Sequence, residues 1–300
     1  MEFSPQSKDD FVHEPSGTRI RFVRNEQGNV TDLVLQRGGE HRAKRVSEVL
    51  PVEPARVVDV SGTTYHTVIS GDGTVPVVLV SGLENWAKVA AGIRNEARVV
   101  RYKADRLGAG SSVPADVGTQ VRSLHELLKT LEIPQPCVFV GHSYDGALVR
   151  IYADLYPDEV AGLVLVDPFD EGFVDWLKAN QPKNYELFQQ RATENYVANW
   201  DDFLEHLRAA KVPKATPVVL LTAGHRQARH NDALETKISA GEFEAGAAAV
   251  MKAHQSFIAK LPNGRQVVVP NAGHEIPGEQ PDFVIQAIQQ ELKGMNHRGK

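Results

Sequence analysis

A serine stands close to two glycines in the stretch GHSYDG (141–146), which follows the apolar run PCVFV (136–140) and precedes a segment with helical periodicity. On a tight turn between a strand and a helix, a serine hydroxyl is exposed and can attack a carbonyl carbon. The residues beside it must be small, because they nearly touch the adjacent helix and strand. Ser143 is therefore the candidate nucleophile of an acyl transfer.

The spacing departs from the common G-x-S-x-G pattern at its last position. Asp145 stands where the second glycine is expected, and Gly146 follows it. Gly146 can relieve the crowding, and an aspartate at a helix N-terminus gains about 0.3–1 kcal/mol from the helix dipole. We expect Asp145 to be a structural variant that faces neighbouring groups. A carboxylate that grips a substrate amine is the alternative.

A serine nucleophile needs a histidine base, and one histidine has the right setting near the end of the sequence. His274 follows the apolar run RQVVVP (265–270) and precedes a helix that opens after Pro281. A base in this position deprotonates the serine and returns the proton to the leaving group.

The acid that would orient His274 is open between three aspartates. Asp167 ends the apolar run AGLVLV (161–166) and is favoured, with Asp232 and Asp170 as alternatives. Asp232 comes late after the run TPVVLL (216–221), and Asp167 could equally cap the helix that follows it.

The oxyanion of an acyl transfer needs two backbone N–H donors. Tyr144, which follows the nucleophile, supplies the first, and Leu83 in VSGLENW (80–86) is the expected second donor.

Short β-branched runs alternate with helical patterns from about residue 57, which predicts a mainly parallel sheet with helices on both faces. YHTVISGDG (65–73) is interpreted as an antiparallel edge hairpin. About fifty residues without a strand separate Val166 from Thr216, too many for a plain connection, and we interpret 168–213 as a helical cap over the site. The core is then 57–167 and 214–300. Further strands are expected at 75–80 and 97–102, and helices at 119–132, 146–156 and 281–294, the last ending on Gly294.

Residues 1–56 form a separate β-rich appendage in this interpretation. The alternation of apolar and polar residues over 18–46 predicts a small β-meander of two or three strands. The run FVRNEQGNVTDLVL (22–35) resembles the accessory segment of serine β-lactamase-like and peptidase proteins.

Together, GHSYDG, the loop YKADRLGAGSS (102–112) and the late Gly-His pair at 273–274 resemble the α/β-hydrolase fold superfamily over residues 65–295. The resemblance implies an esterase-like serine hydrolase that cleaves a carboxylic ester through an acyl-enzyme. The alternatives are an amino-ester or peptide hydrolase, since some relatives of α-amino-acid ester hydrolases have G-x-S-Y-x-G, and a binding protein of this fold that has lost catalysis.

The composition of the chain limits the classes of molecule with which we expect it to interact. The 300 residues are 42% hydrophobic and 24% charged with a net charge of -5, unlike a nucleic-acid binder. No apolar run approaches the length of a membrane span, and the start of this chain lacks the pattern of a signal peptide. We expect a soluble protein that acts on a small-molecule ester, without a cofactor or a metal. Export and oligomeric state stay open.

Overall fold

The computed structural model describes residues 4–13, 16–28, 30–36, 39–44, 55–104, 115–225 and 239–298. The chain divides into two compact units, Met1–Val52 and Glu53–Lys300, which are described one at a time. The predicted boundary after residue 56 falls at the first residue of a strand of the second unit, β6 (Arg56–Val60).

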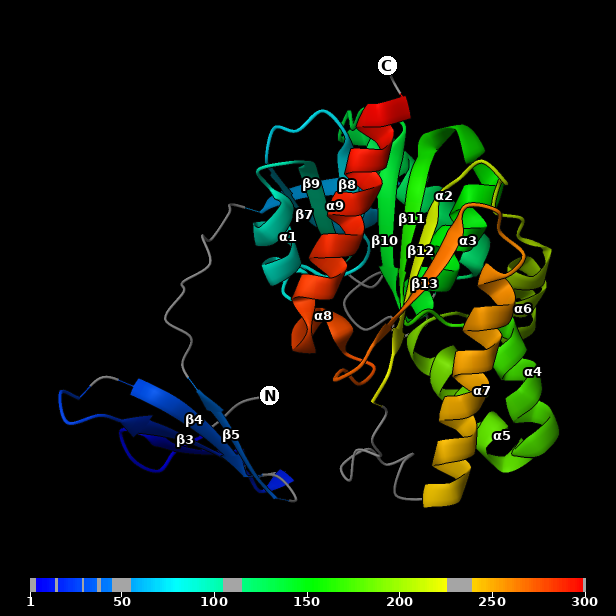
Figure 1. The fold of residues 1–300 in the computed structure, drawn as a ribbon. Helices are drawn as coiled ribbons and strands as arrows, with labels where there is room; N and C mark the ends of the chain where they lie inside the picture. The colour runs from blue at the N-terminus through cyan, green and yellow to red at the C-terminus, as the bar shows by residue number, and fades with distance from the viewer. Residues whose placement is uncertain are drawn as a thin grey trace. The chain divides into compact units, whose positions relative to one another are not determined.

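The first unit is an antiparallel sheet in the order β1-β2-β3-β4-β5 (Figure 1). Its strands are β1 (Ser4–Pro5), β2 (Asp10–His13), β3 (Thr18–Arg24), β4 (Val30–Gln36) and β5 (Glu40–Lys44). The meander of two or three strands expected over 18–46 is confirmed as β3, β4 and β5, whereas β1 and β2 lie before that stretch and were not predicted. The central β3 and β4 have the alternating pattern, whereas β1 is only two residues long and β5 (EHRAK) is almost entirely polar, so pairing with neighbours rather than apolar patterning defines them.

The second unit is built on one sheet in the order β13-β12-β11-β10-β8-β9-β7-β6. Strands β8 to β13 pair in parallel, and β6 and β7 complete one edge in antiparallel orientation. The antiparallel edge hairpin expected at 65–73 is formed by β6 and β7. It therefore begins at residue 56 and ends at residue 70. The strands after β6 are β7 (Thr63–Ser70), β8 (Pro76–Leu79), β9 (Arg98–Ala104), β10 (Cys137–His142), β11 (Val160–Val166), β12 (Val218–Ala223) and β13 (Gly264–Val269).

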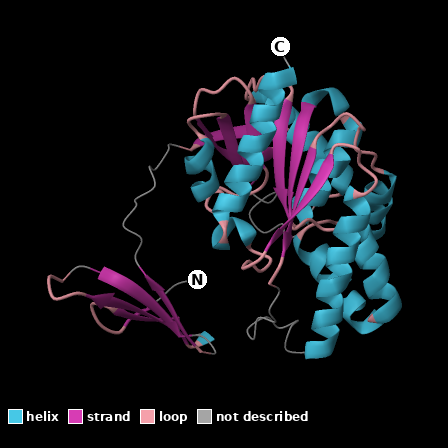
Figure 2. Ribbon diagram, in the orientation of Figure 1, coloured by secondary structure: helices cyan, strands magenta, loops and turns pink. Residues whose placement is uncertain are grey.

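Helices cover both faces of this sheet, as the sequence predicted (Figure 2). Successive strand residues point to opposite faces, so Val78 packs in one apolar core while Val77 and Leu79 pack in the other. The helices are α1 (Ala87–Ile93), α2 (Val117–Thr130), α3 (Tyr144–Leu155), α4 (Glu171–Asn180), α5 (Pro182–Asn195), α6 (Trp200–Ala209), α7 (Ala240–Ile258), α8 (Ile276–Glu279) and α9 (Pro281–Arg298), with a 3₁₀ turn at Pro157–Glu159. Helix α9 passes through Gly294 and ends four residues later.

The long interval between β11 and β12 contains the helices α4, α5 and α6. Their aromatic residues pack together, for example Phe188 against Trp200 with ring centroids 5.9 Å apart. None of the helices in the described ranges is long and apolar enough to cross a membrane.

Candidate active site

The nucleophile candidate lies on a strained turn between β10 and α3. Ser143 has φ 56° and ψ -121°, a backbone conformation that residues with a side chain rarely adopt. A Cβ at Gly141 would lie 2.4 Å from the Asp145 carbonyl oxygen, and a Cβ at Gly146 would lie 2.7 Å from Pro168 Cβ. The turn therefore needs glycine at 141 and at 146, whereas position 145 accepts a side chain.

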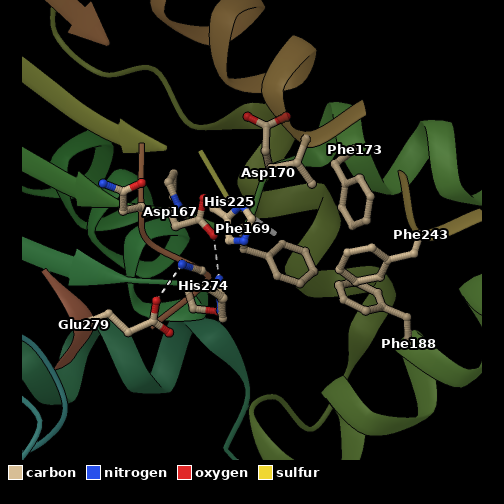
Figure 3. A pocket seen from close by; sticks show the side chains of 14 residues that line it. Asp167, Phe169, Asp170, Phe173, Phe188, His225, Phe243, His274 and Glu279 are labelled. Atoms are coloured by element: carbon tan, nitrogen blue, oxygen red, sulfur yellow. Dashed lines mark hydrogen bonds and ion pairs between the residues drawn. The ribbon is translucent and has the colours of Figure 1, made fainter. Parts of the chain in front are cut away.

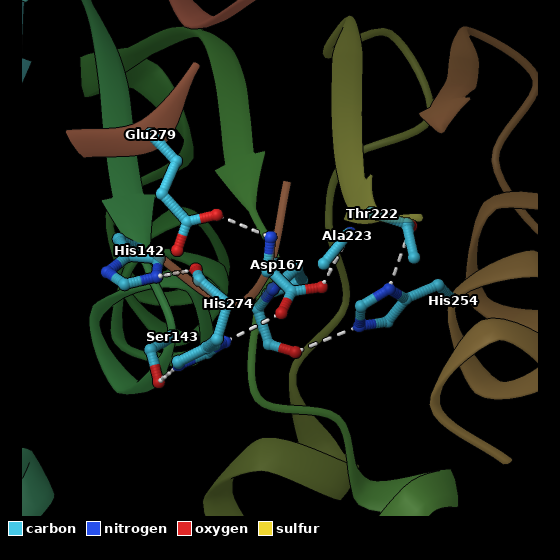
Figure 4. Close-up of polar contacts among 10 residues, drawn as sticks. His142, Ser143, Asp167, Thr222, Ala223, His254, His274 and Glu279 are labelled. Atoms are coloured by element: carbon cyan, nitrogen blue, oxygen red, sulfur yellow. Dashed lines mark hydrogen bonds and ion pairs between the residues drawn. The ribbon is translucent and has the colours of Figure 1, made fainter. Parts of the chain in front are cut away.

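Three predicted residues are brought together at this turn (Figure 4). Ser143 Oγ lies 2.9 Å from His274 Nε2, and His274 Nδ1 lies 2.6 Å from Asp167 Oδ2. The side chain of Asp167 is completely buried, while that of His274 is 40% exposed. The Ala223 N–H donates to Asp167 Oδ1 at 3.1 Å, so both carboxylate oxygens accept a hydrogen bond.

Of the other two acid candidates, Asp170 does not take this place. Asp170 caps the N-terminus of α4, where its Oδ1 accepts the Gly172 N–H at 2.7 Å. Burial raises the pKa of Asp170, and Glu171 adds to the rise, while Arg150, with its Nη1 3.6 Å from Asp170, opposes both effects. Asp232 lies outside the described residues.

The acid stands on a second strained turn, which is hydrogen-bonded to the first. Asp167 has φ 43°, in the left-handed region that costs a non-glycine residue about 1–3 kcal/mol. Its N–H donates to the Leu221 carbonyl at 2.7 Å, and the Phe169 N–H donates to the Ser143 carbonyl at 2.9 Å. These bonds hold the two turns, which we call the nucleophile turn (141–146) and the acid turn (167–169), in a fixed arrangement.

His142 holds the base from behind, a role that sequence reasoning missed. Its Nε2 donates to the His274 carbonyl at 2.7 Å, and the two rings lie 4.7 Å apart. Burial and, to a smaller extent, the nearby His274 together lower the pKa of His142 to about 4, so His142 is neutral near pH 7. Glu279 supports the same loop by accepting the Gly273 N–H at 2.6 Å.

Among the described residues, one group of side chains could hold a metal ion. It consists of His142, His274 and Glu275, whose potential ligand atoms lie within 4.8 Å of one another. Both ring nitrogens of His274 and the Nε2 of His142 already take part in hydrogen bonds. A metal ion at this place would have to break the contacts between serine, histidine and aspartate.

The two expected oxyanion donors lie on segments with fixed backbones. Tyr144 is the first residue of α3. Leu83 follows β8 in a loop where Ser81 has φ 51° and Gly82 has φ 131°. The Gly82 N–H donates to the Tyr102 carbonyl at 2.8 Å, and the Leu83 carbonyl accepts from Arg101 Nη1 at 2.6 Å, so the peptide groups on either side of the Leu83 N–H are anchored.

Asp145 is hydrogen-bonded to Ser81 of this loop. Burial raises the pKa of Asp145 to about 7, and the Ser81 bond limits the rise. Asp145, at which the sequence departs from G-x-S-x-G, thus contacts the loop that carries Leu83. Sequence reasoning identified the departure but not this contact.

A cavity of about 560 Å³ opens beside Ser143 and His274 (Figure 3). One wall is apolar, with Phe169 and Phe173 from the acid turn and α4, Phe188 from α5, and Phe243 and Val250 from α7. We call it the aromatic cavity. Its polar lining residues include Asp167, Asp170, His225, Asn271 and Glu279.

A second cavity, of about 520 Å³, borders two further side chains of the nucleophile turn, Tyr144 and Asp145. We call it the polar cavity, because most of its described lining residues carry a hydroxyl, amide or charged group. These include Tyr65, Ser81, Glu84, Asn85, Tyr102, Lys103, Gln120, Ser123, Asn195 and Tyr196.

Comparisons with known proteins agree with this architecture. Residues 75–217 match the family model described as the alpha/beta hydrolase fold. The chain is 24% identical to the uncharacterized protein YqjL of Bacillus subtilis over 239 residues, which is 76% of this chain and 88% of that protein. It is 31% identical to the lipase LipV of Mycobacterium tuberculosis over 142 residues, which is 46% of this chain and 42% of that protein.

Among solved structures, the carboxylesterase CesB of Bacillus subtilis superimposes with a TM-score of 0.52 at 15% identity, covering 82% of this chain and 93% of that chain. At this identity the similarity concerns the fold, which is the one predicted from the sequence motifs. With lipase and esterase neighbours, the comparisons support a hydrolase. The chain therefore has the α/β-hydrolase fold.

Proposed function

We propose that this protein is a serine hydrolase that cleaves a carboxylic ester through an acyl-enzyme. The observation that carries the proposal is the continuous hydrogen-bonded series from Ser143 Oγ through His274 to the buried Asp167, at the edge of a cavity large enough for a small organic molecule.

In the first half-reaction His274 Nε2 takes the proton from Ser143 Oγ as the oxygen bonds to the ester carbonyl carbon. Asp167, whose two carboxylate oxygens each accept a hydrogen bond, stabilises the imidazolium that results. The backbone N–H groups of Tyr144 and Leu83 donate to the oxyanion. The bond to the alcohol oxygen then breaks, and His274 gives the proton to the leaving alcohol.

In the second half-reaction a water molecule takes the place of the alcohol. His274 removes a proton from the water as its oxygen attacks the acyl carbon, and the carboxylic acid leaves as the bond to Ser143 Oγ breaks and that oxygen recovers its proton. No step of this sequence needs a metal ion or a cofactor.

The aromatic cavity suggests the part of the substrate that the protein selects. Phe169 and Phe188 are stacked with centroids 5.1 Å apart, and Phe173 meets Phe188 edge-on at 5.9 Å. Flat and edge-on ring surfaces favour another ring or a branched apolar group. We therefore expect esters with an aryl or branched acyl group to react faster than acetates.

A fluorophosphonate tests the mechanism, because it phosphonylates an activated serine. We expect intact-mass analysis to show one adduct on the wild-type protein and none on the Ser143→Ala variant. Absence of an adduct on the wild-type protein, together with no hydrolysis of a p-nitrophenyl ester series, would leave a binding protein of this fold as the better interpretation.

A further inference from the structure

His254 lies behind the acid turn, where the mechanism does not use it. It belongs to α7 and is fully buried. Its Nε2 lies 2.9 Å from the Pro168 carbonyl oxygen, and its Nδ1 lies 2.9 Å from Thr222 Oγ1 (Figure 4). His254 lines neither the aromatic nor the polar cavity, so it is not placed to touch a substrate there.

The hydrogen-bond partners define which nitrogen of His254 carries the proton. A carbonyl oxygen only accepts, so Nε2 must donate to Pro168. On the other side, Gln266 Nε2 donates to Thr222 Oγ1 at 2.7 Å, which leaves the threonine hydroxyl proton for the Nδ1 of His254. The series from Gln266 through Thr222 and His254 to Pro168 is therefore directional and consistent with a neutral ring.

Pro168 makes this bond important for the acid. Proline has no N–H, so its carbonyl is the one backbone group through which it can be anchored by a hydrogen bond. Residues on both sides of it are anchored by their own N–H groups, Asp167 to Leu221 and Phe169 to Ser143. Without His254, the Pro168–Phe169 peptide group would lose the donor to its carbonyl and would be held only through the bond from the Phe169 N–H to Ser143, so the proline that follows the strained Asp167 could shift.

We infer that His254 is a positioning residue for Asp167: its Nε2–H bond to the Pro168 carbonyl keeps the carboxylate in line with His274 Nδ1. The inference rests on the proposed function, in which Asp167 is the acid. The acid turn also touches α3, the helix that follows Ser143, since the Pro168 side chain fills the space next to Gly146. A displaced Pro168 would therefore disturb Asp167 and the nucleophile turn together.

Two amide substitutions separate the two hydrogen bonds of His254. His254→Gln places an amide nitrogen near the position of Nε2 and can still donate to Pro168. His254→Asn reaches only as far as Nδ1, so it can bond Thr222 but not Pro168. We expect kcat to fall about 30- to 100-fold in the Asn variant and less than about 5-fold in the Gln variant, since a displacement of about 1 Å can cost about 100-fold. KM should change less than about 3-fold in both.

A spectroscopic readout follows the acid itself. The proton between His274 Nδ1 and Asp167 Oδ2, which are 2.6 Å apart, should give a far-downfield ¹H NMR signal in the wild-type protein. We expect the signal to persist in His254→Gln and to weaken or vanish in His254→Asn. A purely structural role of His254 would not couple this signal to kcat.

Ala253→Gly, one residue earlier in α7, is the control for a weakened helix, and we expect it to lower the melting temperature without lowering kcat more than about 3-fold. Equal kcat in the Gln and Asn variants, or a wild-type NMR signal in the Asn variant, would overturn the inference, as would an equal loss of kcat in Ala253→Gly. Fluorophosphonate labelling of the wild-type protein separates this result from a failure of the proposed function, because labelling tests Ser143 without any change at His254.

Discussion

The two cavities that border the nucleophile turn are similar in volume but differ in the residues that line them. The aromatic cavity, about 560 Å³, includes Ser143 and His274 and has a wall of phenylalanines. The polar cavity, about 520 Å³, includes Tyr144 and Asp145 and has tyrosines, amides and charged groups. The reacting side chains Ser143 and His274 thus line the aromatic cavity, while Asp145, which departs from G-x-S-x-G, lines the polar cavity. Chemistry and substrate selection should depend on the first, and positioning of the oxyanion loop on the second.

The largest effects should come from the side chains that react. Ser143→Ala and His274→Ala should each lower kcat for short p-nitrophenyl esters by about 10⁴-fold or more, because each removes a group without which the serine cannot attack. Initial rates at saturating ester measure the loss, with circular dichroism to verify folding. A Ser143→Ala protein that retained activity would contradict the mechanism.

Asp167→Asn should come next, with a loss in kcat of about 10²- to 10⁴-fold. The amide resembles the carboxylate in shape, but it cannot stabilise an imidazolium and it favours the wrong tautomer of His274. Asp170→Asn is the matched control, because Asp170 lines the same cavity but caps α4 instead of contacting His274. A smaller loss for Asp167→Asn than for Asp170→Asn would reject Asp167 as the acid.

Removal of one aromatic ring should distinguish the cavities. Phe188→Ala in the aromatic cavity should lower kcat/KM for a phenylacetyl ester about 10- to 50-fold and for an acetyl ester less than about 3-fold, because only the larger acyl group reaches the ring. Tyr196→Ala in the polar cavity should change both values less than about 3-fold. Similar losses in the two variants would mean that the acyl group does not occupy the aromatic cavity.

Asp145 should have the smallest effect on rate. Asp145→Gly should keep or raise kcat, because the carboxylate bonds Ser81 and its charge opposes an oxyanion nearby. A loss of about a hundredfold or more in a folded variant would instead make Asp145 part of the machinery and favour amino-ester or peptide substrates.

The effect of Asp145 on stability has a defined sign. Burial raises its pKa from 3.8 to about 7 in the folded protein, so between these values the folded state holds a proton that the unfolded state has lost. This contribution to stability is present below the unfolded pKa and is lost as pH rises through the folded pKa. Asp145→Asn should therefore gain in melting temperature relative to the wild-type protein between pH 4 and pH 8. A difference that is constant with pH would show that the carboxylate is not buried in this way.

The strands and helices that could be predicted well from the sequence are those whose own residue pattern is sufficient to identify them. Runs such as PCVFV and AGLVLV are apolar on both faces, and they became the buried strands β10 and β11. By contrast, Gly294 was expected to stop the last helix, but a glycine inside a helix costs only about 1 kcal/mol and α9 continues beyond it. The polar strand β5 depends on its partner β4 and has no signal of its own.

The residues of the candidate site likewise divide into those that the local sequence identifies and those that only the fold identifies. Ser143, His274 and Asp167 could be proposed because each follows a strand, and strand ends meet at one edge of a parallel sheet. His142 and His254 could not be assigned, because their partners lie 132 and 86 residues away and only the fold brings them into contact. A histidine next to a nucleophile was the one available signal for His142, and nothing in the local sequence distinguishes His254 from other helix residues.

The 19-residue helix α7 contributes Phe243 and Val250 to the wall of the aromatic cavity, and it also carries His254, which lies behind the acid turn. Mutations that reshape the cavity from this helix would also shift the support of Asp167, so new substrate preferences gained there should carry a penalty in turnover. Phe173 and Phe188 stand on α4 and α5, which do not carry His254. Lineages of this protein that diverge in substrate should therefore vary first at those two positions, and α7 should drift most slowly.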